Sequence, residues 1–408
     1  MLKQFTSFME AQKPQLDLLK VVTPSDNVEQ KNKWIASAEK GHFTNPVLHY
    51  SDNRDAARAS TLELNALERQ LPKAISPTDI FIRSLIVEAI RQQCLVNTIA
   101  ISVYNGDDSL TSGLLRDYHG ATSDEIKQIA YTLADGDKSI LACGTIDDEK
   151  QKLSAERYAK AKSDIYNAED IKKLFKAVLE DYGLLGEWTV VVDDTYSSVT
   201  VKTYDPNGAS RIYIPASKTA SEVDSIKLAG HEVECHVRHN MNCAGILQQL
   251  GFPSQVARYL VSNRDATLTE GYAKVSDMLN GRRMSGKTIG APLPWYIIAA
   301  DMASKGESFA HVAEYLHSKG RSVEQCWNTT IRIFRGCHDT ANMHHYAREA
   351  DRCYLEGYLK AKSNLDNPLF DFAKFDKVIL DKIHELIGEF HATYPFQDIC
   401  GKIITYMS

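Results

Sequence analysis

The sequence predicts an α+β protein that is mostly helical, with a small antiparallel sheet directly before a helix that carries two histidines. Apolar residues recur at helical spacing in the front third and again through the rear half of the chain. β-branched and aromatic residues concentrate between residues 188 and 214. A helix-start signal follows that stretch at once. These three observations together define the fold class.

The front third of the chain is expected to be helical. Its apolar residues fall on one face of a helix in the stretches 56–71, 80–100 and 123–133. The polar residues on either side of residue 140 mark the best candidate boundary, although no Gly/Ser- or Pro-rich linker occurs there. We therefore expect a helical N-terminal segment, 1–140, packed on a main domain, 141–408.

The middle of the chain changes to strand chemistry. Strands are predicted at 188–192, 198–204 and 211–214, with turn residues such as Asp205-Pro206-Asn207-Gly208 between them. Short strands joined by tight turns imply a small antiparallel sheet. Ser221 and Asp224 then have the spacing of a capping box, which predicts a helix running to about residue 240.

Composition excludes several functional classes. The chain has 408 residues and a formal net charge of -6, which argues against a broad surface for nucleic acid or for anionic membranes. Its eight cysteines form no C-x-x-C pair, so a zinc ribbon or redox motif is not expected. We see no signal-peptide h-region and no apolar run of roughly 18 residues. A reduced, cytoplasmic protein is the expectation, with neither nucleic-acid nor membrane partners.

The central motif is His231-Glu232-Val233-Glu234-Cys235-His236. Zinc takes neutral imidazole ligands and a carboxylate while leaving a position open for water, and an adjacent carboxylate can remove that water's proton. A histidine helix preceded by a small sheet is the usual setting of a zincin-like metallopeptidase core. Chance His-Glu pairs are nevertheless common on amphipathic helices, so the pair alone is a weak signal.

The spacing of the two histidines leaves two possibilities open. Residues five apart diverge by roughly 140° on a regular α-helix, so His231 and His236 would point to different faces. The extra residue can be absorbed as a π-bulge, which is common at functional sites. Alternatively Cys235, four residues after His231, is the second ligand and His236 is not. A third ligand is suggested by Glu270 in the segment 267–273, where a later helix should begin.

The pattern His-Glu-x-x-x-His followed by Thr-x-Glu-Gly-x-Ala is similar to the tyrosine and glutamate carboxypeptidase-like metallopeptidases, whose best-known members are the microtubule-associated tyrosine carboxypeptidases. Weaker matches are spread over most of the chain, at 45–50, 182–184, Trp188 and 331–336. One departure is notable. The family often has a Lys-Asp pair where Ala350 precedes Asp351 here, which bears on substrate preference.

The resemblance implies a zinc-dependent metallopeptidase of carboxypeptidase type with one zinc ion. His231, His236 and Glu270 would be its ligands and Glu232 its general base. This choice of His236 predicts a helix irregularity between Glu232 and His236. The substrate would be the C-terminal tail of a peptide or protein. An endopeptidase with the same core, or a catalytically idle module that binds protein tails, is the alternative.

A carboxypeptidase must also hold a free carboxylate, which arginine does best because its guanidinium binds both oxygens. The first candidates are Arg332 and Arg335, and the second are Arg238 and Arg352. Tyr272 and Tyr354 are candidates for stabilising the oxyanion of the transition state. Each of these residues can equally be structural. The group of His338, His344 and His345 is read as a polar loop rather than a second metal cluster, and His239 as exposed or supporting a ligand.

Overall fold

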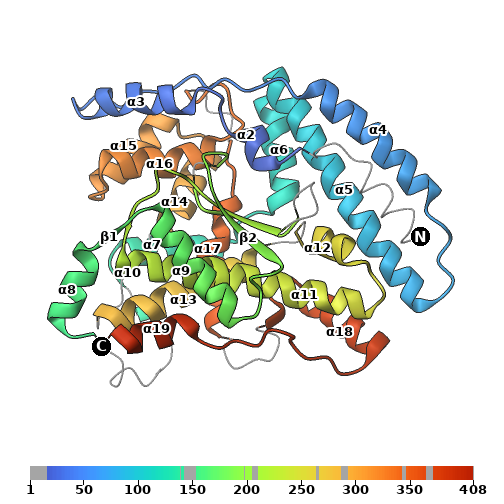
Figure 1. The fold of residues 1–408 in the computed structure, drawn as a ribbon. Helices are drawn as coiled ribbons and strands as arrows, with labels where there is room; N and C mark the ends of the chain where they lie inside the picture. The colour runs from blue at the N-terminus through green and yellow to red at the C-terminus, as the bar shows by residue number, and fades with distance from the viewer. Residues whose placement is uncertain are drawn as a thin grey trace.

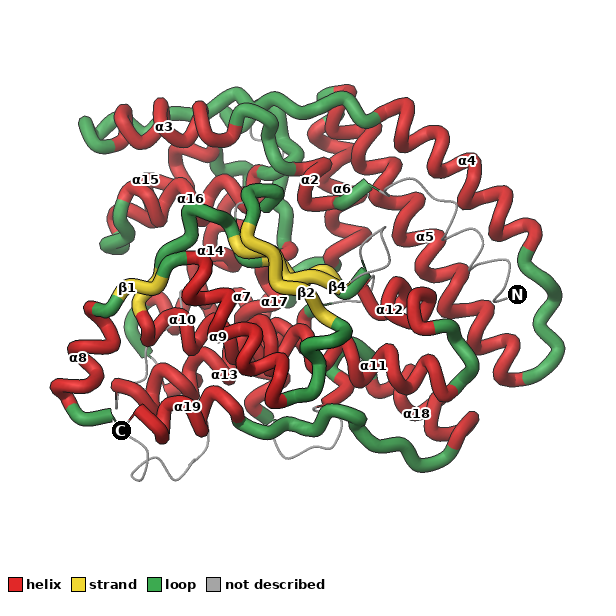
Figure 2. The backbone as a smooth tube through the Cα atoms, viewed as in Figure 1, coloured by secondary structure: helices red, strands yellow, loops and turns green. Residues whose placement is uncertain are grey.

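A computed structural model describes residues 16–137, 139–141, 153–196, 198–204, 210–262, 266–285, 293–341, 346–363 and 371–407. Helices surround a small sheet that lies near the middle of the molecule (Figure 1; Figure 2). The predicted α+β, mostly helical class is confirmed.

The front of the chain is helical, as predicted. Its helices are α2 (Leu18–Val22), α3 (Asn27–Ala38), α4 (Arg54–Gln70), α5 (Pro77–Asn105), α6 (Asp108–His119) and α7 (Asp124–Ala134). The longest of them, α5, starts at a capping box in which Ser76 and Asp79 bond each other's backbone N–H groups. It ends at Gly106, whose φ of 71° suits a residue without a Cβ.

Two helices and a short strand lead to the sheet. After the 3₁₀ turn η1 (Ser139–Leu141) come α8 (Ala155–Ser163), β1 (Ile165–Tyr166) and α9 (Ala168–Asp181). A capping box at Asn167 and Asp170 starts α9, and its stripe of Ile171, Phe175 and Val178 is fully buried. This stripe packs under the sheet, which begins seven positions beyond the helix at Trp188.

The sheet differs from the prediction. Its strands are β2 (Trp188–Val192), β3 (Thr200–Lys202) and β4 (Ser210–Ile214), in the order β2-β4-β3. The β3–β4 pair is antiparallel, but β2 and β4 are parallel, so the sheet is mixed. The expectation of an antiparallel meander was wrong because β4, the most deeply buried of the three, takes the centre and leaves β3 at an edge. Separately, β1 pairs antiparallel with β5 (Ala220–Ser221).

The predicted motif helix forms and runs further than expected. The Ser221 side chain accepts the N–H of Asp224 at 3.1 Å and starts α10 (Glu222–Ala229). A π-helical segment, Gly230–Val237, follows without a break, and α11 (Arg238–Gln249) continues it. The rear of the chain is helical: α12 (Ser254–Ser262), α13 (Thr267–Ser285), α14 (Leu293–Ser304), α15 (Phe309–Ser318), α16 (Val323–Phe334), η4 (Ala350–Arg352), α17 (Cys353–Lys362), α18 (Lys377–Ile387) and α19 (Ile399–Met407).

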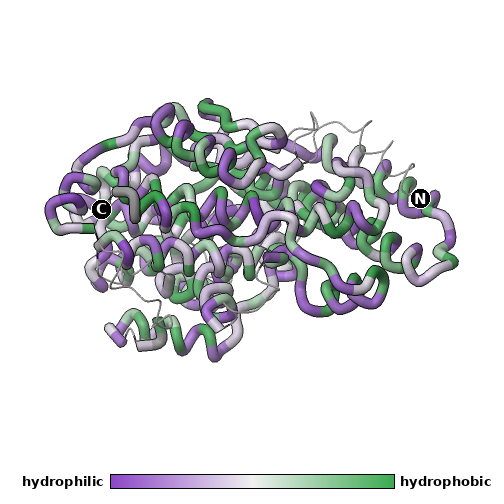
Figure 3. Tube along the Cα trace, turned by 60° about the horizontal axis from the view of Figure 1, so that its bottom comes forward, coloured by the Kyte–Doolittle hydropathy of each residue, from purple (hydrophilic) through white to green (hydrophobic). Residues whose placement is uncertain are grey.

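The front and rear of the chain share hydrophobic cores. Trp34 of α3 contacts Phe309 and Trp327, with ring centroids 5.8 and 5.5 Å away. Ile86 of α5 lies in one cluster with Leu247 of α11. Along most helices, hydrophobic and hydrophilic positions alternate as this packing requires (Figure 3). The N-terminal helices are thus packed on the rest of the chain, while a boundary near residue 140 stays a prediction. Among the described residues, no helix is both long and apolar enough to cross a membrane.

Helices α13 and α17 approach each other unusually closely at two glycines. A Cβ placed on Gly271 would lie 2.0 Å from the Gly357 carbonyl oxygen, and one on Gly357 would lie 2.0 Å from the Thr267 carbonyl oxygen. Any side chain at either position would force the backbones apart. The glycine after Glu270 is therefore required by packing between the two helices.

Replacing Gly271 by alanine should destabilise the protein by about 3 kcal/mol or more, because the methyl group meets rigid backbone. Gly113→Ala is the matched control, since Gly113 lies in exposed helix with nothing within 4 Å of a Cβ. The control should be neutral or stabilising by up to about 1 kcal/mol. Urea unfolding measures both. Equal stabilities for the two variants would show that the contact tolerates a side chain.

Candidate metal centre and active site

The π-helical segment brings the two histidines of the motif onto one side. In an i→i+5 turn, residues five apart lie above one another instead of diverging. The imidazole ring centroids of His231 and His236 are 4.9 Å apart. The predicted helix irregularity is therefore confirmed. Cys235 is 1% exposed and packs in an apolar cluster with Ala273, and burial raises the pKa of its thiol. The geometry favours His236 over Cys235 as a ligand.

Glu270, in the first turn of α13, faces both histidines. Its carboxylate oxygens lie 3.6 Å from His231 Nε2 and 3.4 Å from His236 Nε2. One ligand atom from each of the three residues lies within 4.8 Å of the other two. Burial would raise the pKa of Glu270, but the two histidines hold it well below its usual value. Its Oε2 is buried without a hydrogen-bond partner, as expected of an atom that faces a metal.

Two residues that the sequence analysis missed support this group. Asp277 Oδ2 lies 3.2 Å from His231 Nδ1, so His231 presents Nε2 toward Glu270. Lys274 Nζ donates to the same Asp277 oxygen at 2.8 Å. Burial lowers the pKa of His231, but Asp277 outweighs it and the net pKa rises to about 10. Lys274 and Asp277 follow Glu270 by four and seven residues, a helical spacing that could have revealed them.

The charges of this region suit a divalent cation. Glu232, Glu270 and Asp277 are three carboxylates that face the single ammonium group of Lys274. With both imidazoles neutral, as metal ligands are, two negative charges are left over beside them. Two imidazole nitrogens and a carboxylate are also the donor set that catalytic zinc sites use. The described residues fit a zinc ion on both counts.

Glu232 and Tyr354 are the candidate catalytic side chains beside His231, His236 and Glu270, the three residues called the ligand group from here on. Burial raises the pKa of the Glu232 carboxyl, and Glu270 and Asp277 add to that rise, while the two histidines oppose it. Tyr354, from the start of α17, lies under the Lys274 ammonium, which is 5.2 Å from its ring centroid. Burial, followed by the charges of Glu270 and Asp351, raises the pKa of Tyr354 well above its usual value. Its hydroxyl therefore stays protonated and can donate.

Tyr272 and Arg238 lie in a different, buried network. The Tyr272 ring packs 5.6 Å from that of His239 and is 2% exposed. Arg238 is fully buried, donates to the Glu234 carbonyl at 2.6 Å and to His239 Nε2 at 2.9 Å, and pairs with Asp371. The structure does not bring these two candidates to the ligand group, and His239 is buried rather than exposed.

The remaining candidates are also placed. Arg352 donates to the His119 carbonyl at 3.1 Å and pairs with Glu356. Arg332 pairs with Asp351 at 2.7 Å, and its guanidinium lies 5.2 Å from the Tyr296 ring centroid. His338 Nε2 lies 2.6 Å from the Val103 carbonyl oxygen, as in a structural loop. His344 and His345 lie outside the described residues.

The C-terminal segment holds the motif helix through Glu234. This glutamate is fully buried, and its Oε1 accepts the N–H groups of Ile399 at 2.5 Å and Cys400 at 3.2 Å, at the start of α19. Asn242 of α11 exchanges hydrogen bonds with the backbone of Tyr394 at 2.8 and 2.9 Å. Nothing in the motif's spacing indicated this role for Glu234, because its partners lie far along the chain.

Glu234→Ala should lower the free energy of unfolding by about 1–3 kcal/mol, because two buried N–H groups of α19 lose their acceptor. Glu234→Gln keeps an acceptor oxygen in the same place and should lose clearly less. Chemical denaturation of both variants beside the parent protein measures this. A glutamine variant as unstable as the alanine variant would assign the effect to charge rather than to helix capping.

The fold and the site define a class: a mostly helical α+β protein in which a His-Glu-x-x-x-His helix and a glutamate from a later helix converge on one point. The sequence model of the microtubule-associated tyrosine carboxypeptidases matches residues 40–370. The chain therefore belongs to that family, which implies a carboxypeptidase-type hydrolase activity. No curated protein matches the chain.

Proposed function

We propose that the protein is a zinc-dependent carboxypeptidase that removes the last residue of a peptide or protein chain, with a C-terminal tyrosine as the first substrate to test because of the family's description. One observation carries the proposal. The ligand atoms of His231, His236 and Glu270 converge within 4.8 Å, and Glu232 directly follows the first ligand. We further propose a zincin-like core and a cytoplasmic location, with no nucleic-acid or membrane partner.

Zinc, when bound, would polarise the scissile carbonyl and acidify a water molecule. The raised pKa of Glu232 suits a general base that takes a proton from the attacking water and passes it to the leaving amine. Tyr354 would donate its hydroxyl proton in a hydrogen bond to the oxyanion that develops on the substrate. Asp277 and Lys274 hold His231 in the orientation that this arrangement needs.

Glu232→Gln should keep zinc near one equivalent and reduce kcat by at least about a hundredfold on a peptide ending in tyrosine. Glu125→Gln, an exposed glutamate on α7, is the control and should retain full activity. Elemental analysis and release of free tyrosine are the two measurements. The same peptide with an amidated C-terminus should resist the parent enzyme. Cleavage of both peptides at equal rates would instead indicate an endopeptidase, and full activity of Glu232→Gln would exclude this base.

Asp277→Ala should weaken zinc binding by about 10–100-fold, because His231 loses the group that fixes its ring. Competition with a chromophoric chelator gives the affinity without any assay of activity. Asp181→Ala removes an exposed aspartate at the end of α9 and should leave the affinity unchanged. If both variants bind zinc as the parent does, Asp277 does not support the site.

A further inference from the structure

Three arginines meet around one carboxylate at the end of α16. Asp351 accepts from Arg332 at 2.7 Å and from Arg348 at 3.4 Å. Arg335 forms no ion pair within the described part of the chain, and its Nε is buried without a hydrogen-bond partner. The Nε of Arg348, a residue only 8% exposed, is likewise buried and unpartnered. Two positive charges in this cluster are therefore not balanced.

Among the described residues, no carboxylate other than Asp351 forms an ion pair with Arg335 or Arg348. Glu349 is engaged by the N–H of Thr122 at 2.6 Å, and Glu356 pairs with Arg352 and Lys360. Burial and the nearby Arg348 and Arg352 keep the pKa of His119 well below its usual value, so its ring is neutral and adds no further positive charge. Burial, then Arg348 and Arg332, lower the pKa of Arg335 to about 10. Keeping an unpaired guanidinium there costs free energy that a bound anion would offset.

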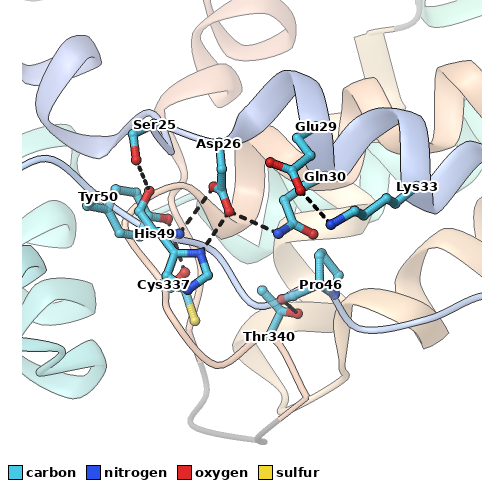
Figure 4. Close-up of polar contacts among 10 residues, drawn as sticks. All are labelled: Ser25, Asp26, Glu29, Gln30, Lys33, Pro46, His49, Tyr50, Cys337 and Thr340. Atoms are coloured by element: carbon cyan, nitrogen blue, oxygen red, sulfur yellow. Dashed lines mark hydrogen bonds and ion pairs between the residues drawn. The ribbon is translucent and has the colours of Figure 1, made fainter.

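The loop that carries Arg335 is held rigidly. Gly336 has a φ of 90°, and a Cβ there would lie 2.7 Å from the Tyr346 hydroxyl, which donates to the Arg335 carbonyl oxygen. The Tyr50 hydroxyl accepts the Gly336 N–H at 2.9 Å and donates to the Cys337 carbonyl at 3.0 Å. Figure 4 shows Tyr50 against Cys337, in the same loop. These contacts fix the backbone from which the Arg335 side chain projects.

The segment 45–50, whose Asn-Pro pair contributed to the family resemblance, anchors the same loop. Thr340 donates to the Pro46 carbonyl at 2.6 Å (Figure 4). The Leu48 N–H donates to the His338 carbonyl at 3.3 Å. His49 is in turn tied to Asp26 at the start of α3, with 2.7 Å between Nδ1 and Oδ2. The motif therefore has a structural role, which is to hold the loop at the end of α16.

The cluster is connected to the ligand group through two tyrosines. The Tyr354 ring lies 5.2 Å from Nζ of Lys274, which supports His231 through Asp277. Arg332 lies 5.2 Å from the neighbouring Tyr296 ring. Tyr296 packs beside Tyr354, with ring centroids 5.8 Å apart. A substrate whose last peptide bond lies at His231, His236 and Glu270 would have its C-terminal residue against these two tyrosines and its carboxylate toward the arginines.

We propose that Arg335 and Arg348 bind the α-carboxylate of the substrate's last residue, an assignment that rests on the proposed function. Both guanidinium groups offer an unused buried donor, and a carboxylate can accept from each of them. Arg332 pairs with Asp351 more closely than Arg348 does, at 2.7 against 3.4 Å, and none of its nitrogens is among the buried unpartnered atoms of the described residues. Arg238 and Arg352 are tied to Asp371 and Glu356. Arg348 was not among the residues that the sequence singled out, and it acts here as a specificity-determining residue.

Calorimetric binding of N-acetyl-tyrosine and its amide tests the assignment without turnover, in a Glu232→Gln background. Arg335→Gln and Arg348→Gln should each raise the Kd of the acid about tenfold or more and leave that of the amide unchanged. Arg335→Lys keeps the charge and loses the planar guanidinium, so its Kd for the acid should lie between those of the parent and of Arg335→Gln. Arg116→Gln, an exposed arginine on α6, is the control. Unchanged binding of the acid by folded Arg335 variants would overturn the assignment.

Stability separates a binding role from a structural one. Removing an arginine that supports the fold should lower Tm, whereas removing the unpaired Arg335 should leave Tm unchanged or raise it. A fall in Tm with unchanged Kd would make Arg335 structural. If the parent protein cleaves no peptide but binds N-acetyl-tyrosine in a way that depends on Arg335 and Arg348, the proposed carboxypeptidase function is wrong and the carboxylate-binding assignment is supported. If the parent and Arg335→Gln cleave free-acid peptides equally well, the carboxylate-binding assignment is wrong and the proposed carboxypeptidase function is kept.

Discussion

The contact between α13 and α17 at Gly271 and Gly357 is the constraint on which the site depends. Because the two backbones nearly touch, Glu270 of one helix and Tyr354 of the other are brought to the same place. The opposite side of α13 is fixed in a similar way. A Cβ on Gly230 would lie 2.8 Å from both Ser276 and Asn280 of α13, so the π-helical segment also packs closely against this helix. Small residues at both contacts set the spacing from which the ligand geometry follows.

Two buried polar side chains of the motif helix receive their partners from the end of the chain. Glu234 Oε1 caps α19, and the buried guanidinium of Arg238 pairs with Asp371, so both polar side chains find partners near the end of the chain. The partner residues all follow residue 370, where the family match ends. The helix that carries His231 and His236 is therefore held in part by residues that lie outside the matched region.

Charge in the active-site region is separated into two groups. Around the two histidines, carboxylates exceed ammonium groups, whereas at the end of α16 three guanidinium groups share one carboxylate. Tyr354 and Tyr296 lie between the two groups. A cation at the first group and a carboxylate at the second would offset the charge of each. The aromatic side chains would give the C-terminal residue of a substrate an apolar surface to pack against.

The sequence alone determined the helices, the motif and Glu270, because helical periodicity, capping residues and ligand spacing are local properties. It left Cys235 and His236 open, and only the π-helical segment, whose backbone packs against α13, shows that His236 lies beside His231 and Glu270. The sheet was predicted as antiparallel because turn signals do not say which strand takes the centre, and burial of β4 settled that. The sequence could not predict that Arg335 forms no ion pair among the described residues. Whether a charge has a partner depends on residues distant in the chain, and only the tertiary structure brings those together.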